Sequence, residues 1–310
     1  MKSINFIIFF IIVIFNTHKS YSDEKVYIEI KINNEIITNF DLEKEKNYLN
    51  ALNPNLKDLK DELQITIARD SIAKEVIKKD ELKKYFDLNS KNIKINKFIK
   101  NFLENLGFNN EIQFEDYLLK YGWTLDEVKE KIKIEVLWNQ FIFDKYQNQV
   151  QINVTKLKDK INSDKDKKFK TLYDLSEIVF QIKKDKNFKI TYDSIKKSIS
   201  EIGFENTANL YSVSDSAKIG GKIGWVDENS LSTKLSSALK NIESGQYTMP
   251  INLNNGFIIL KINNKKNEEK IIDFDKELKK LIKFEETKQL NNFSKIYFDK
   301  IKKNIKIDEY

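Results

Sequence analysis

The spacing of the apolar residues changes near residue 170, and this change is the strongest constraint on the fold. From Thr38 to about residue 148 the apolar residues recur every three to four positions, as they do in amphipathic helices. Between 171 and 265 short alternating runs and helical runs are mixed, which is typical of a compact α+β domain. Helical spacing returns over 272–302. The pattern therefore predicts an α+β multidomain protein that is mostly helical in its N-terminal part.

The first 22 residues are typical of an export signal. Lys2 is followed by an unbroken apolar run, Phe6 to Phe15. Ten helical residues span about 15 Å, half of a hydrocarbon core of about 30 Å, so the run suits a signal peptide better than a transmembrane helix. Small residues precede a cleavage site that we place after Ser22. We therefore expect a periplasmic protein, with an uncleaved membrane anchor as the alternative.

Composition excludes several classes of chemistry. The chain has no Cys, and its one His, His18, falls in the predicted signal. The mature chain therefore cannot use a thiol nucleophile, a Ser-His-Asp triad or a His- or Cys-ligated metal, and we expect neither a metal nor a cofactor. Charges of both signs are interspersed and Arg69 is the one arginine, a pattern that argues against nucleic-acid binding.

A glycine-rich segment in the mixed region resembles a known family. Residues 211–226, YSVSDSAKIGGKIGWV, resemble the "FS…S…GGDLGW" stretch of parvulin-type peptidyl-prolyl isomerases. Residues 235–262 resemble the stretch that follows it in that family, with matching order, spacing and glycines. The permissive backbone of glycine suits a loop that turns sharply into a strand, beneath which we expect a tryptophan to pack. These structural positions are Gly220, Gly221, Gly224 and Trp225.

The N-terminal region resembles the SurA-type periplasmic chaperones. It has a strand-turn-strand around "NNE.IT..D", followed by helices that include GWTLDEVKEKIKIEV at 122–136. The resemblance implies a SurA-like helical domain at 23–161, a linker at 162–170 and a single parvulin-like domain at 171–265. It also implies that the tail, 266–310, folds back onto the N-terminal domain. We expect that contact to use Leu281, Ile282, Phe293 and Ile296.

The chain departs from the parvulin pattern at both histidines of the family. Glu177 stands where the first strand of active members carries a His in an "HIL" motif, and Ile258 stands where the last strand carries the second. The acidic or thiol position of the loop corresponds to Ser214 or Asp215. A carboxylate accepts hydrogen bonds but donates none, and Ile258 does neither. An apolar slot for the proline ring could still be lined by Leu235, Leu239, Met249 and Phe257.

Three functions remain open at this stage. The resemblance favours a periplasmic chaperone that acts as a monomer, needs no cofactor and binds unfolded outer-membrane protein precursors and aromatic-rich peptides. A second possibility is an active peptidyl-prolyl isomerase with an atypical site. A third is a folding factor that stays tethered to the membrane by its N-terminal segment.

Overall fold

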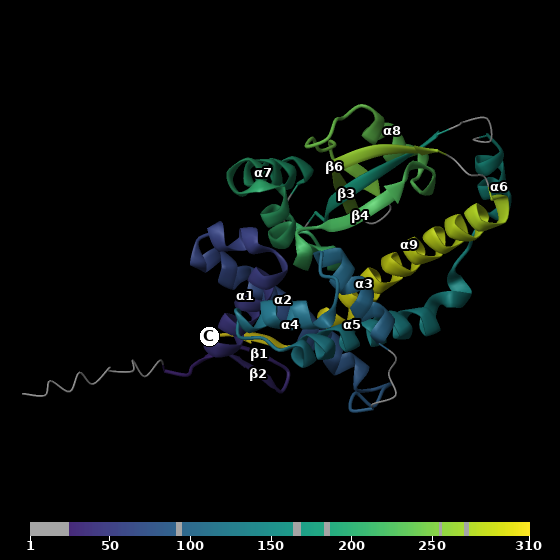
Figure 1. Ribbon diagram of the computed structural model, residues 1–310. Helices are drawn as coiled ribbons and strands as arrows, with labels where there is room; N and C mark the ends of the chain where they lie inside the picture. Colours follow the sequence, from purple (N-terminus) through teal and green to yellow (C-terminus); the bar gives the residue numbers. More distant parts are fainter. Residues whose placement is uncertain (1–24, 91–94, 164–168, 183–186, 254–255, 270–272) are drawn as a thin grey trace, which may run out of the picture.

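The computed structural model describes residues 25–90, 95–163, 169–182, 187–253, 256–269 and 273–310 (Figure 1). A helical unit, residues 39–146, forms the base of the molecule in this view, and a mixed unit, residues 169–269, lies above it. A long helix from the C-terminal part of the chain runs diagonally between the two. The predicted signal, residues 1–22, lies outside the described residues. Within the described ranges no helix has the length and apolar character needed to cross a bilayer.

Five α-helices of the described residues build the helical unit, and capping signals of the sequence mark the ends of several of them. Thr38 and Asp41 form a capping box at the first helix, and Thr124 and Glu127 form another at the fifth. Gly107, with φ of 87°, ends the third helix in the left-handed conformation. The helices pack around a core that includes Leu49. Their bounds are α1 (Asn39–Leu52), α2 (Asp61–Leu82), α3 (Asn96–Leu106), α4 (Glu111–Leu119) and α5 (Leu125–Tyr146).

The mixed unit is a four-stranded antiparallel sheet with a helix on each face. The strands lie in the order β4-β3-β6-β5, and they are β3 (Phe169–Phe180), β4 (Lys222–Asp227), β5 (Ile251–Leu253) and β6 (Gly256–Glu269). Helix α7 (Phe188–Tyr211) packs on one face of the sheet, around Ile178 and Ile259. Helix α8 (Thr233–Lys240) packs on the other face, around Leu175 and Leu260. Two short 3-10 helices, η3 (Asp215–Ile219) and η4 (Glu228–Ser230), flank β4.

Two elements of the mixed unit are longer than the sequence pattern indicated. The pattern predicted a helix over 191–201, whereas α7 continues to Tyr211 through a kink at Gly203, where φ is 82°. The glycine breaks the helical spacing and so hid the second half of the helix. Strands β3 and β6 also pair beyond the proposed 171–265 range, as far as Phe169 opposite Glu269.

The two ends of the described chain meet in a second sheet. Its strands lie in the order β2-β1-β7, and they are β1 (Ile28–Ile32), β2 (Glu35–Thr38) and β7 (Ile307–Glu309). The strand β7 pairs antiparallel with β1, with Lys31 opposite Asp308. The last residues of the chain therefore complete a sheet that begins near residue 28, and Figure 1 shows the C-terminus beside β1.

The long C-terminal helix, α9 (Phe274–Lys302), contacts two parts of the molecule. Its second half packs on α5 through Phe293, Tyr297 and Phe298, which surround the buried Trp138. Its first half contacts α6 (Val154–Ser163) and η4, where Lys280 lies 3.2 Å from the carboxylate of Asp227. The expected contact residues therefore need correction: Ile296 is 51% exposed, and Leu281 belongs to the half that lies beside α6 and η4. The helix turns Ile296 away because Tyr297 and Phe293 take the inward positions.

Candidate functional site

A hydrogen-bonded cluster forms around Glu177 on the central strand β3. The hydroxyls of Ser214 and Ser216 both donate to Oε1 of Glu177, at 2.6 and 2.9 Å. Ser216 Oγ also lies 3.0 Å from Ser214 Oγ. Of the two residues considered for the loop position, Ser214 faces Glu177, whereas the side chain of Asp215 is 66% exposed and pairs elsewhere.

Backbone contacts of the loop explain why the serines reach Glu177. The amide of Val213 donates to the carbonyl of Val179 at 2.8 Å, so the chain continues along β3 before η3 begins. The amide of Glu177 donates to the carbonyl of Gly221 at 2.8 Å, and the amide of Gly221 donates to the carbonyl of Ser216, also at 2.8 Å. These bonds close the loop over Glu177.

Glycine at 221 is required by the closeness of this loop to β3. Its φ is 77°, and an added Cβ would collide with the backbone carbonyl oxygen of Glu177. A side chain at this position would force the loop away from the strand. By contrast, Trp225 does not pack beneath the loop as expected: it is 48% exposed, with the ammonium of Lys266 4.6 Å from its ring. The side chain alternation of β4 turns Trp225 away from the α8 face, which takes its neighbour Val226.

The pKa of Glu177 lies above its ordinary value. Burial is the main cause, and the nearby carboxylate of Asp215 adds to it, while the two serine hydroxyls act in the opposite direction. A glutamic acid that keeps its proton is a hydrogen-bond donor. We expected Glu177 to be a carboxylate that donates no hydrogen bond, and its burial instead favours the protonated form.

The second position of the family's histidine pair is apolar in its surroundings as well as in its side chain. Ile258 is 6% exposed and belongs to the apolar cluster beneath α8, opposite Val179 of β3. The site therefore has one titratable group, Glu177, on its central strand and hydrocarbon at Ile258.

The four residues expected to line a proline slot do not come together. Leu235 and Leu239 lie in the cluster under α8, and Leu239 is 1% exposed. Phe257 lies on the other face of the sheet, 4.8 Å from the ring of Phe188 between centroids. Met249 is 69% exposed, and its sulfur accepts a hydrogen bond from Tyr192. The alternation of side chains across the sheet separates these residues, and the sequence spacing did not reveal it.

A partly buried ion network joins the cluster's loop to the helical unit. Glu135 of α5 lies 2.6 Å from the ammonium of Lys78 of α2 and 3.2 Å from that of Lys218 of η3. Lys78 also reaches Asp215, at 3.1 Å. Burial opposes the charge of Glu135, but Lys78 and Lys218 outweigh it and lower the pKa of Glu135 to about 2. Burial likewise opposes the charge of Lys218, and Glu135 more than offsets it, so the pKa of Lys218 is raised.

Apolar and amide contacts strengthen this docking. Ile202 and Leu210 of α7 and Ile219 of η3 pack against the core of the helical unit. Asn53 donates to Asn209 at 2.7 Å, and Asn206 donates to the carbonyl of Asn55 at 3.1 Å. The loop that carries Ser214 is thus held between its own sheet and the helical unit.

Sequence reasoning missed Ser216, Glu135, Lys78 and Lys218. Ser216 lies two positions after Ser214, and this spacing was a usable signal. Glu135 lies 83 positions before Lys218, and Lys78 lies 137 positions before Asp215, so no local pattern connects them to the loop.

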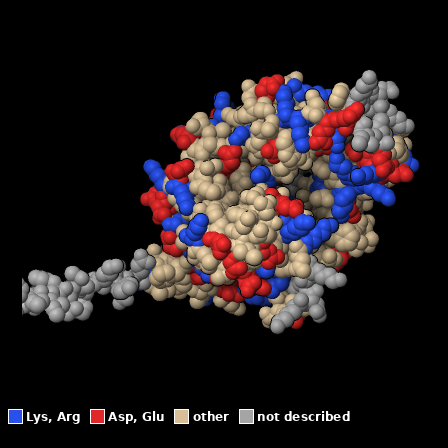
Figure 2. Space-filling view, viewed as in Figure 1, with Lys and Arg blue, Asp and Glu red and all other residues tan. Residues whose placement is uncertain are grey.

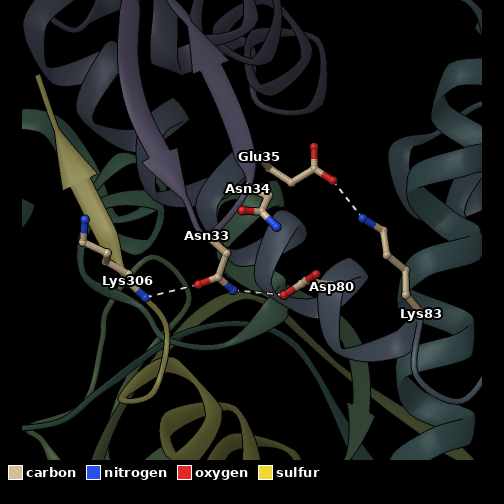
Figure 3. Close-up of a pocket in the computed structure, with 6 residues that line it drawn as sticks. All are labelled: Asn33, Asn34, Glu35, Asp80, Lys83 and Lys306. Carbon is tan, nitrogen blue, oxygen red and sulfur yellow. Dashed lines mark hydrogen bonds and ion pairs between the residues drawn. The ribbon is translucent and has the colours of Figure 1, made fainter.

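A polar pocket of about 540 Å³ lies elsewhere, between the β1–β2 turn, the end of α2 and the strand β7 (Figure 3). Its polar groups largely satisfy one another. Asn33 donates to Asp80 at 3.0 Å, Lys83 pairs with Glu35 at 2.8 Å, and the amide of Lys306 donates to Asn33 at 3.3 Å. Across the described ranges no group of three or more metal-binding side chains is found either. Neither feature adds chemistry to the Glu177 cluster.

Comparison with known proteins places the mixed unit in a family. Residues 174–264 match the family model of the rotamase, or PPIC-type PPIase, domain. The chain is 26% identical to the chaperone SurA of Pseudomonas putida over 50% of this chain and 38% of that protein. It is 30% identical to the foldase PrsA of Pediococcus pentosaceus over 54% of each. The chain thus matches about half or less of the length of these relatives.

Among solved structures, PrsA from Bacillus subtilis is 20% identical, with 91% of this chain and 93% of that chain covered and a TM-score of 0.30. The family match and the sequence relatives lead to the same assignment. Residues 174–264 belong to the PPIC-type peptidyl-prolyl isomerase family, and the chain carries this domain beside sequence similar to the SurA and PrsA folding factors.

Proposed function

We propose that this chain is a periplasmic chaperone that binds unfolded outer-membrane protein precursors and has little or no prolyl isomerase activity. The observation that carries the proposal is the pair of residues at the family's histidine positions, Glu177 and Ile258. The proposal includes a monomeric protein that needs neither a cofactor nor a metal.

The chemistry of isomerisation supports weak catalysis. Rotation about a prolyl bond makes no covalent bond, so an enzyme has to stabilise the twisted amide of the transition state. Ile258 offers that amide no donor or acceptor. The hydroxyls of Ser214 and Ser216 are directed to Oε1 of Glu177 and not into open space. The apolar residues expected to grip the proline ring are also divided between the two faces of the sheet.

Holding an unfolded chain needs accessible apolar surface, and the mixed unit offers it. Several large apolar side chains on different elements of this unit are between 38% and 69% exposed: Phe188, Ile190, Val213, Ile223, Trp225 and Met249. Scattered exposed apolar residues are ordinary on a protein surface, but several around one domain suit transient contacts with aromatic-rich segments. None of these contacts depends on Glu177.

Two assays on the purified mature chain test the proposal. In the first, a urea-unfolded β-barrel protein is diluted into buffer with the chain, and aggregation is followed by light scattering. We expect suppression at about stoichiometric concentration. In the second, a protease-coupled assay measures isomerisation of a proline-containing tetrapeptide, and we expect a rate close to that in buffer. Unchanged aggregation would overturn the chaperone proposal.

A second candidate, a slow isomerase, is favoured by the raised pKa of Glu177. Glu177→Gln and the double variant Glu177→His with Ile258→His separate the two. Under the chaperone proposal Glu177→Gln leaves the tetrapeptide rate unchanged, and only the double variant can gain activity. If the unmodified chain catalyses isomerisation and Glu177→Gln abolishes it, the slow-isomerase function replaces the proposal of weak activity. The third candidate, a membrane-tethered factor, depends on residues 1–22 and is tested by N-terminal sequencing of the protein from a membrane fraction.

A further inference from the structure

The strand β4 is an open edge of the mixed sheet. It pairs with β3 on one side, and it is the first strand in the order β4-β3-β6-β5. On its other side no backbone hydrogen bond of the described residues reaches positions 223–226. The strand has six residues and no proline. Edge strands with unpaired amides and carbonyls are templates for another strand, and proteins commonly block them with proline, bulges or a covering element.

Two large apolar side chains stand beside this edge. Trp225, opposite Asp174 of β3, is 48% exposed, and Ile223, which lies where the register between β3 and β4 shifts, is 42% exposed. The chain has three tryptophans, and the other two, Trp123 and Trp138, are buried. The one accessible indole of the protein therefore lies on a strand with one unpaired edge.

The edge faces a hollow of the molecule. Figure 2 shows the surface hollowed between β4 and α9, with lysine side chains on the rim. Both ends of β4 are tethered across this space. Lys222 donates to the carbonyl of Asn105 at the end of α3, and Lys280 of α9 pairs with Asp227. The middle of the strand, between these two tethers, is left open.

The charge at the edge is positive at one end. Lys222 bonds a neutral carbonyl, and no carboxylate of the described residues forms an ion pair with it. At the other end Asp227 already has Lys280. A carboxylate on an incoming segment would therefore find, at the Lys222 end, an ammonium that has no carboxylate partner among the described residues.

We propose that the edge of β4 binds an extended segment of an unfolded polypeptide as an added strand. The backbone of the segment pairs with positions 224–226, its aromatic or aliphatic side chains lie against Trp225 and the neighbouring Ile223, and an acidic residue meets Lys222. This inference rests on the proposed chaperone function and names the surface and the backbone form that it recognises. Alternating apolar residues in an extended chain are what an unfolded β-barrel strand presents.

A peptide with alternating aromatic and threonine residues and one terminal aspartate tests the proposal on the full chain. Its affinity is measured by fluorescence anisotropy, together with the emission of Trp225. A series of peptides carries one N-methyl group at successive positions. Only every second amide of an added strand points at β4, so we expect methylation to weaken binding about five- to tenfold at alternate positions and little between them. Hydrogen exchange should also slow in β4 on binding.

Variants locate the contact independently of the peptide series. Trp225→Ala and Ile223→Ala should each weaken the peptide by about fivefold or more, whereas Ile112→Ala, which truncates a 74% exposed isoleucine on α4, should not. Peptide binding that is indifferent to N-methylation and to Trp225→Ala would overturn the edge proposal while leaving the chaperone function intact. A chain that neither binds the peptide nor suppresses aggregation would overturn both.

Discussion

Replacing Glu135 by glutamine should destabilise the docked arrangement of the two units by about 3 kcal/mol. A pKa held at about 2 in place of 4.5 corresponds to a preference of about 3 kcal/mol for the ionised form in the folded protein. The side chain is 27% exposed, and among the described residues Glu135 is the one carboxylate paired with Lys218. Glutamine keeps the volume but removes the negative charge that Lys78 and Lys218 share. Losing one partner of a fully buried pair typically costs about 3–5 kcal/mol, so this partly buried group should fall at the lower end of that range.

Urea unfolding followed by tryptophan fluorescence measures this change, because Trp123 and Trp138 report on the helical unit. The matched control is Glu130→Gln on the same helix. Glu130 is 69% exposed and pairs with Lys133, so its loss should cost less than about 0.5 kcal/mol. Hydrogen exchange over 212–221 should also quicken in Glu135→Gln, since the network holds that loop. Equal stabilities of the two variants would refute the reasoning.

The pH dependence of the same comparison has a defined sign. Because the folded pKa of Glu135 is depressed, its contribution is fully present above the ordinary value of 4.5 and is lost as the pH falls towards about 2. The difference in unfolding free energy between the wild-type chain and Glu135→Gln should therefore shrink between pH 5 and pH 2. A difference that stays constant over this window would contradict the assignment.

Three other outcomes are expected. Glu177→Gln should gain stability relative to the wild-type chain as the pH rises above 4.5, because burial raises the pKa of Glu177 and ionising this side chain costs folded stability. Urea titrations at several pH values measure the difference between the two chains, and the opposite trend would count against the raised pKa. Gly221→Ala should cost more than about 2 kcal/mol of stability or detach the loop, because φ at Gly221 is 77° and the Glu177 carbonyl oxygen blocks an added Cβ. In Gly224→Ala an added Cβ has no atom within 4 Å, so that variant should bear only the strain of its φ. Thermal unfolding compares the two variants, and equal losses would refute the collision at Gly221. Tyr297→Phe should cost about 1–3 kcal/mol, because it removes the hydroxyl that donates to the buried Glu81. Tyr310→Phe, at a 73% exposed site, should be neutral. Similar urea unfolding midpoints for the two variants would exclude a stabilising role for the Tyr297–Glu81 hydrogen bond.

The placement of the helices and of the mixed unit could be predicted from the sequence, because those signals are local. The capping boxes at Thr38 and Thr124 begin α1 and α5, Gly220 and Gly221 precede β4, and Gly224 lies within it. The substitutions at Glu177 and Ile258 were also visible in the sequence, since each position is set by its strand motif. The spacing of apolar residues was enough to separate the helical unit from the mixed unit.

Tertiary structure alone decided what those residues contact. The sequence left Ser214 and Asp215 as alternatives, and the fold of the loop turned Ser214 to Glu177 and Asp215 to Lys78. It also divided the expected slot residues between two faces of a sheet and exposed Trp225. The pKa of Glu135 depends on lysines from α2 and η3, which local spacing cannot bring together. Burial and long-range charge pairing arise only when distant segments pack, so these properties are absent from any local pattern.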